Sequence, residues 1–443
     1  MKHAARGAWL LLGVIVLGGC ASYRPLPLDA DSSAATSLAD AAKQIEHPRL
    51  TPLTIDPNGP WDDLQLADLA IVISPELRAL RAQRKIADAQ VFSAGLLPDP
   101  QIGIGVDRPD GSGLVSAFTL SAGLDIGALL TRKRRLAGAR AAAEQVRNDV
   151  AWKEWLAANQ VRLLARRFEF LQHQHAIAAS AADAAENLLD LTKTSVDQGN
   201  AKLDELVLRR VAVLDARGRE RSLQRETEAT RLSLNQTVGV DPQVQIPLRD
   251  VTTLHDPATL DVSALDVRAI GQRLDLAALR AGYASQEASV RTAILQQYPL
   301  PTVTISRARD TTLVYTKGAA VTFALPLWNR GRGALAVADA TREQLHQEYA
   351  ARAFDTRATI AAQVEALQQI AAQHQLLDAQ LEAMSAEMKP LEAAAQRRDV
   401  ALVTYETARA ALLDKQIASV ALAQAQSEGE IALDIAVGGL VWQ

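Results

Sequence analysis

The sequence predicts a mainly α-helical protein with a small β component, built from two similar repeats of about 200 residues. Short motifs recur at a constant offset, two stretches of about 65 residues have helical periodicity with almost no proline or glycine, and each repeat contains a pair of strand-like segments. Aromatic residues make up only 4% of the chain, while alanine, leucine, glutamine, glutamate and arginine dominate long stretches. This composition is typical of long packed helices.

The first twenty residues have the pattern of a bacterial export signal. Lys2 and Arg6 precede an apolar run at 8–17, which is shorter than the roughly 20 residues that span a bilayer. Cys20 is the only cysteine in the chain and follows two glycines, so that it resembles the lipidated cysteine of a bacterial lipoprotein. We therefore expect residues 1–19 to be a signal peptide that is removed, and acyl and diacylglycerol groups on Cys20.

The repeat sets the domain organisation. Segment 77–82 recurs at 276–281 with the same leucines and the same Arg-Ala pair, and Leu234, Val238 and Gly239 have counterparts at the same offset of 199 residues. Two remaining segments are expected to form a belt around the middle of the long helices. The predicted divisions are the signal peptide at 1–19, a lipidated segment and belt at 20–63, repeat 1 at 64–239, a belt or linker at 240–265, and repeat 2 at 266–443.

Each repeat is expected to contain the same elements in the same order. A helix of about 30 residues leads to two strands with period-two alternation, which are followed by a long helix and a shorter returning helix. For repeat 1 the expected ranges are 64–97 for the opening helix, about 100–108 and 114–124 for the strands, and about 132–237 for the helical hairpin. For repeat 2 they are 267–297, about 301–308 and 313–325, and about 332–437.

The helix lengths predict how the helices pack. A helix of about 65 residues is near 100 Å long, and no single returning helix matches it. The returning helix at 201–237 and the opening helix at 267–297 together have about that length, so we expect them to stack end to end along the first long helix. By the same argument, 401–437 and 64–97 are expected to stack along the second.

Several motifs then resemble the outer-membrane efflux protein family, the TolC-like channels. Segments 66–79 and 272–276 resemble the openings of the two repeats in that family, although Leu274 stands where a proline is usual. The segment Phe-Ala-Leu-Pro-Leu-Trp-Asn-Arg-Gly-Arg at 323–332 resembles the connection from the last strand to the long helix. A lipidated chain is more similar to the channels that serve resistance-nodulation-division pumps.

The resemblance implies a homotrimer in which four strands per chain close a twelve-stranded barrel in the outer membrane, above an α-helical cylinder in the periplasm. A closed barrel leaves no unpaired backbone in lipid. It further implies a passive channel that receives substrates from an inner-membrane pump and a periplasmic adaptor. The formal net charge of −4 makes nucleic acid an unsuitable partner.

A channel of this kind needs a gate at its periplasmic tip, because rings of charge at a constriction set permeability. The candidates surround the turns between the long and returning helices. The alternative is that they only cap and solvate the helix ends. The candidate gate residues are Asp197, Asp204, Glu205, Arg397, Arg398, Asp399, Thr404 and Thr407.

Other functional classes have less support. The seven histidines, three methionines and Cys20 form no recognisable metal-binding pattern, and no polar constellation indicates an enzyme, so neither a metal nor a cofactor is expected beyond the lipid groups. A lipid-anchored periplasmic coiled-coil scaffold without a pore stays open as an alternative. So does an outer-membrane channel of a type I secretion system.

Overall fold

The computed structural model describes residues 23–28, 59–249 and 253–442. Residues 23–28 belong to a first compact unit, 1–34, and form no helix or strand. Every element described below belongs to the second unit, 35–443. The predicted signal peptide and Cys20 lie outside the described residues. The prediction of a mainly helical chain with a small antiparallel sheet is confirmed.

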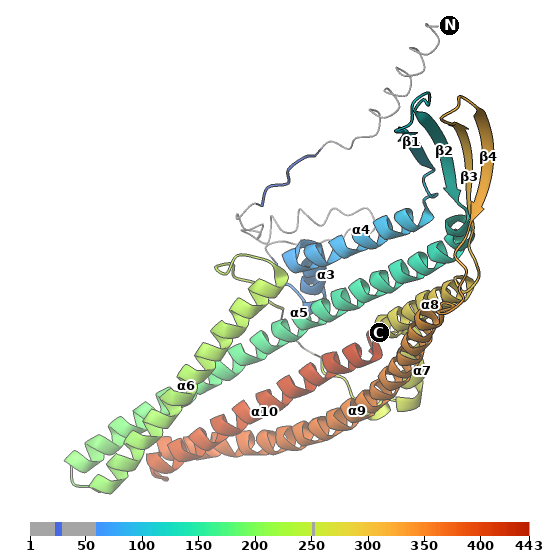
Figure 1. Cartoon of the computed structure of the whole chain (residues 1–443). Coiled ribbons are helices and arrows are strands. Elements are labelled where there is room, and N and C mark those ends of the chain that lie inside the picture. Colours follow the sequence, from blue (N-terminus) through green and yellow to red (C-terminus); the bar gives the residue numbers. More distant parts are fainter. Residues whose placement is uncertain (1–22, 29–58, 250–252, 443) are drawn as a thin grey trace. The chain divides into compact units, whose positions relative to one another are not determined.

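Two long helices dominate the second unit, and each turns back into a helix of 36 residues (Figure 1). The long helices have 72 and 65 residues, or roughly 108 and 98 Å. Within the described ranges no helix is both long and apolar enough to cross a membrane. The four helices are α5 (Ile126–Asp197), α6 (Leu203–Val238), α9 (Arg332–Gln396) and α10 (Leu402–Val437).

The two strand pairs join into one antiparallel sheet in the order β1-β2-β3-β4. The central strands come from opposite halves of the chain and pair from Phe118 with Arg309 to Asp125 with Thr302. The second strand of each pair begins later than predicted, because Gly113 (φ 86°) and Leu313 lie in left-handed turns. The strands are β1 (Gln101–Asp107), β2 (Ala117–Asp125), β3 (Thr302–Arg309) and β4 (Tyr315–Thr322).

The prediction of one continuous opening helix in each half is wrong, because each is broken into two helices. Ser74 has ψ 122°, the conformation that the ring of Pro75 imposes on the preceding residue. No proline explains the second break at Arg273, whose guanidinium instead binds Asp275 at 2.7 Å and donates to the Ala436 carbonyl. The helices are α3 (Asp63–Ile73), α4 (Pro75–Gly95), α7 (Val262–Gln272) and α8 (Leu274–Leu295).

The helix packing agrees with one of the two stacking predictions. Both α6 and α8 contact α5, as expected, and α10 contacts α9 as well as α5. The prediction that the first opening helix lies along the second long helix is wrong for this chain, since α4 packs on α5. Arg81 and Arg84 of α4 hold it there through ion pairs with Glu154 of α5 at 2.6 and 3.0 Å.

Two hydrophobic clusters lie near the middle of the long helices. The first gathers Trp61, α3, the middle of α5 and the end of α6, and the second gathers α7, the middle of α9 and the end of α10. In the described part of the expected belt, Trp61 donates to the Pro247 carbonyl and accepts from the Arg249 amide, both at 2.8 Å. Segments that pack on these clusters therefore lie at mid-length of the long helices.

Candidate functional site

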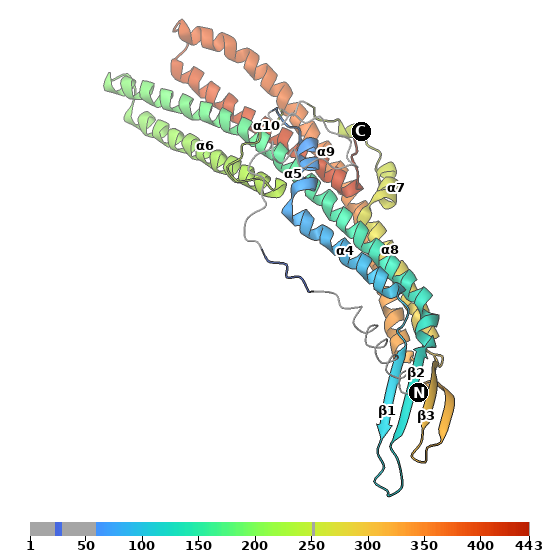
Figure 2. The ribbon, with the colours of Figure 1, turned by 90° about the horizontal axis from the view of Figure 1, so that it is seen from above.

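The two turns between antiparallel helices lie at the end of the helices opposite the strands (Figures 1 and 2). The first turn joins α5 to α6 and the second joins α9 to α10. All eight residues predicted to form a gate lie in or beside these turns, and all eight side chains are exposed. Their role as a gate stays a prediction.

The first turn presents carboxylates at a helix N-terminus. Asp197 is the last residue of α5, and Gly199 has φ 73° in the turn. Asp204 and Glu205 lie in the first turn of α6, where the helix dipole favours negative charge. Asp204 also accepts from the Glu205 amide at 3.1 Å. Asp204 and Glu205 therefore at least stabilise the start of α6 through the helix dipole.

The second turn carries a local ion pair. Arg397 donates from Nε to Asp399 at 2.9 Å, so the structure brings these two candidates together. Arg398 has φ 66°, the left-handed conformation that Gly199 adopts 199 residues earlier in the chain. Among the described residues, no ion pair joins one turn to the other.

Thr404 and Thr407 face solvent. Glu406, which lies between them, is not among the predicted gate residues, although its side chain is buried. Thr407 donates its hydroxyl hydrogen bond to the Val403 carbonyl of its own helix. Glu406 is only 9% exposed, lies 3.6 Å from Arg409, and has one carboxylate oxygen without a hydrogen-bond partner. Its helical spacing from Leu413 and Ile417, which are partly buried and buried, respectively, was the indication in the sequence that it lies on the packed face of the helix.

Polar contacts connect the first helical hairpin to the second. Arg167 of α5 forms two hydrogen bonds of 2.8 Å with Glu428 of α10. Nearer the tip, Arg219 of α6 pairs with Asp414 of α10. This contact lies beside a hollow of about 340 Å³ lined mainly by alanines of α5, α6 and α10. Small side chains therefore leave space between the hairpins where the charged pair joins them.

Within the first hairpin, α5 and α6 are joined by a cluster around Arg217. Its guanidinium contacts Glu186 at 2.7 Å, Glu220 at 2.8 Å and Asp183 at 2.9 Å. The hydrogen bond to Glu186 raises the pKa of Arg217, and the same bond lowers the pKa of Glu186. The cluster favours a fixed register of α6 on α5.

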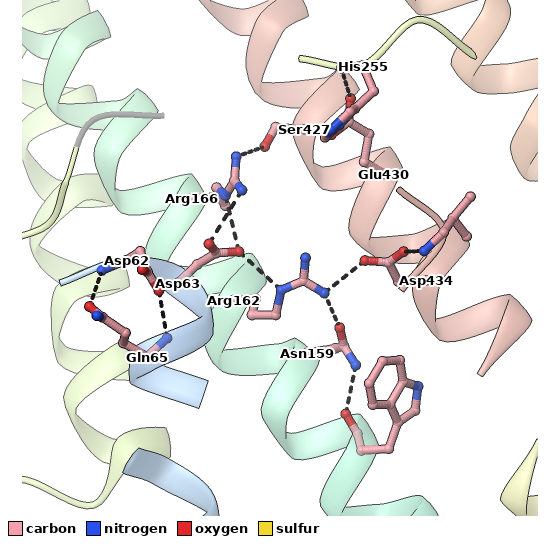
Figure 3. A network of polar contacts seen from close by, with 12 residues as sticks. Asp62, Asp63, Gln65, Asn159, Arg162, Arg166, His255, Ser427, Glu430 and Asp434 are labelled. Carbon is pink, nitrogen blue, oxygen red and sulfur yellow. Dashed lines mark hydrogen bonds and ion pairs between the residues drawn. The ribbon is translucent and has the colours of Figure 1, made fainter. Parts of the chain in front are cut away.

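A buried charge network joins α3, α5 and α10 (Figure 3). Arg162 of α5 is only 8% exposed and contacts Asp63 at 3.1 Å and Asp434 at 2.9 Å. Arg166 contacts Asp63 at 3.3 Å, so two cations face two carboxylates. Burial raises the pKa of Asp434, and the hydrogen bond from Arg162 opposes that rise. The network therefore holds together segments 272 residues apart in sequence.

The sheet has two chemically different faces. Residues paired across the strands share a face, and the pairing of Ile104 with Leu120 places the large apolar side chains together. One face carries Ile102, Ile104, Val106, Phe118, Leu120, Leu124, Val303, Ile305 and Val321. The opposite face carries Gly103, Gly105, Thr119, Ser121, Gly123, Thr302, Thr304, Ser306, Thr316, Gly318 and Thr322.

This fold is that of the TolC-like outer-membrane channels. No family model and no curated protein matches the chain. The outer-membrane channel OprN is similar with a TM-score of 0.70 and 17% identity, over 95% of this chain and 98% of that chain. The CmeC outer-membrane channel of Campylobacter jejuni has a TM-score of 0.71 and 13% identity, over 95% and 93%. The outer-membrane protein VceC of Vibrio cholerae has a TM-score of 0.68 and 17% identity, over 84% of this chain and 95% of that chain.

Proposed function

We propose that the chain is the outer-membrane channel of a tripartite efflux system. It conducts substrates, received from an inner-membrane pump and a periplasmic adaptor, to the exterior. The similarity to OprN and CmeC, both outer-membrane channels, supports this proposal. The observation that carries it is the four-stranded sheet, which has an apolar face, a face of small polar residues and, among the described strands, two edges without a partner.

The two edge strands of the sheet, β1 and β4, explain why one chain cannot form a closed barrel by itself. In the part of the chain that the structure describes, β1 pairs only with β2 and β4 pairs only with β3. Unpaired backbone groups in lipid cost several kcal/mol each, so a spanning sheet has to close on itself. Three copies supply twelve strands, with β1 of one copy against β4 of the next, and put the small polar face around a water-filled lumen.

Exposed apolar side chains on two helices support the same assembly. Phe92 of α4 and Phe354 of α9 are 71% and 69% exposed, and Ile86 and Val337 on the same helices are also largely exposed. α4 packs on α5 of its own chain, which leaves its apolar residues uncovered. In a trimer, α4 of one copy lies along α9 of the next, so that the exposed apolar side chains of the two helices cover each other.

The helices below the barrel would form the periplasmic conduit, and the two turns its gate. The charged and hydroxyl residues at the turns would line the constriction, and the Arg219–Asp414 pair would resist separation of the hairpins. A lipid anchor on Cys20 would attach the chain to the outer membrane, and the long helices would extend into the periplasm. The acyl and diacylglycerol groups on Cys20 are the only covalent modifications or cofactors that we expect in this protein.

The first test is the mass of the mature protein in mild detergent, by light scattering corrected for bound detergent. A trimer that conducts ions across a planar bilayer supports the proposal. Cysteine pairs test the closure directly: Gly103→Cys on β1 combined in turn with Thr316→Cys, Gly318→Cys or Ala320→Cys on β4 should cross-link copies to trimers. The control combines Gly103→Cys with Thr227→Cys on α6, and this pair should not cross-link. A stable, non-conducting monomer would support the lipid-anchored scaffold instead.

A further inference from the structure

A cationic group interrupts the apolar face of the sheet near the turns of the two hairpins. Arg307 of β3 pairs directly with Lys317 of β4, and Leu120 of β2 is the next partner of Arg307 across the sheet. By strand alternation both cations lie on the same face as Ile305. The face proposed to contact lipid is thus apolar along most of its length and basic at one end.

These two cations lack an internal counter-charge. Both side chains are exposed, and within residues 59–249 and 253–442 neither forms an ion pair. Like charges directly opposite each other on neighbouring strands destabilise a sheet. The guanidinium of Arg307 lies 5.8 Å from the Tyr315 ring centre, which orients it without neutralising it. The pair is therefore suited to an external anion.

A hollow beside the pair gives the anion an apolar neighbour. Its volume is about 430 Å³, and its lining is predominantly apolar. The lining includes Ile102, Leu120, Ala122 and Ile305 together with the two cations, Arg307 and Lys317. The hollow is therefore amphipathic, as the junction between the phosphate and the acyl chain of a lipid is.

We propose that Arg307 and Lys317 bind a phosphate group of an outer-membrane lipid whose acyl chain occupies this hollow. The site rests on the proposed function, because it requires that the apolar face contact lipid. A phosphate between the two cations removes their repulsion and accepts charge-assisted hydrogen bonds from the guanidinium. The hairpin turns lie next to the site, so the lipid would come from the leaflet that those turns reach.

The test uses the full chain in an uncharged detergent and measures lipid binding by native mass spectrometry. The probe is lipid A with two phosphates, compared with the same lipid after phosphatase treatment. Lys317→Glu places a carboxylate opposite Arg307 on the neighbouring strand, so the two side chains can form an ion pair and the sheet should stay folded. Binding of the phosphorylated lipid should weaken at least tenfold. Arg108→Gln removes a cation from the loop after β1, outside the strands and outside the lining of the hollow, and should change binding less than twofold.

The outcomes separate this site from the channel. If Lys317→Glu binds phosphorylated lipid as tightly as the unaltered protein while both are conducting trimers, the site is wrong and the channel stands. If inorganic phosphate displaces the lipid at equal concentration, the site binds free anion and the lipid proposal fails. If the unaltered protein is a non-conducting monomer, both proposals fail. The site is supported if Lys317→Glu loses binding of the phosphorylated lipid while the control Arg108→Gln keeps it.

Discussion

The buried network around Arg162 gives the sharpest prediction about stability. Arg162→Met removes the cation that faces Asp434, which is 3% exposed and then keeps only the hydrogen bond from the Val441 amide. Breaking a buried ion pair by removing one partner costs about 3–5 kcal/mol. Asp63 retains Arg166 at 3.3 Å, so the cost arises mainly at Asp434. A smaller part arises at buried Asn159, which loses its hydrogen bond of 2.7 Å from Arg162. We expect about 3 kcal/mol.

The assay is thermal unfolding followed by circular dichroism, at one protein and detergent concentration. A loss of about 3 kcal/mol should lower Tm by on the order of 5 °C. Arg167→Met is the matched control: it removes an arginine from the same helix whose partner, Glu428, is less buried, and it should cost about 1 kcal/mol. The double variant Arg162→Met with Asp434→Leu removes both charges and should recover most of the lost stability.

The pH dependence follows from the raised pKa of Asp434. Its native-state pKa lies above the unfolded value, so the native state binds more protons and stability falls as pH rises through the native pKa. Loss of Arg162 removes a group that lowers this pKa. Arg162→Met should therefore regain stability when the pH is lowered from 7 toward 5, and Arg167→Met should regain less, because Glu428 is less buried than Asp434. Equal Tm losses for the two variants, or no recovery in the double variant, would refute the reasoning.

Three further predictions concern the turns, the contact between hairpins and the anchor. Gly199→Ala should cost about 1 kcal/mol, because φ is 73° there, whereas Arg398→Ala should be nearly neutral since a side chain already accepts that conformation; chemical denaturation compares them. Asp414→Asn should raise the single-channel open probability without changing the trimer mass, because it weakens the ion pair with Arg219; unchanged gating would exclude the pair from the gate. Cys20→Ser should abolish incorporation of labelled palmitate, and persistent labelling would place the lipid elsewhere.

The sequence by itself determined the elements whose causes are local. Helical periodicity, the scarcity of glycine and proline, and the turn residues around Gly199 set the lengths of α5, α6, α9 and α10 to within a few residues, except that α5 begins earlier, at Ile126. There Asp125 caps the helix by accepting from the Ala128 amide. The same local pattern placed the candidate gate residues at the turns, since chain reversals are where exposed polar residues gather.

The tertiary structure alone decided which distant residues meet. The break at Arg273 has no proline to predict it, and the hydrogen bond from its guanidinium to the Ala436 carbonyl exists only once α10 has packed beside α7. Arg162 and Asp434 each resemble an ordinary charged helix residue in sequence, and so do Arg219 and Asp414. Their pairing depends on how the hairpins are rotated about their axes, and many side-chain contacts between distant segments set that rotation together, so no local pattern carries it.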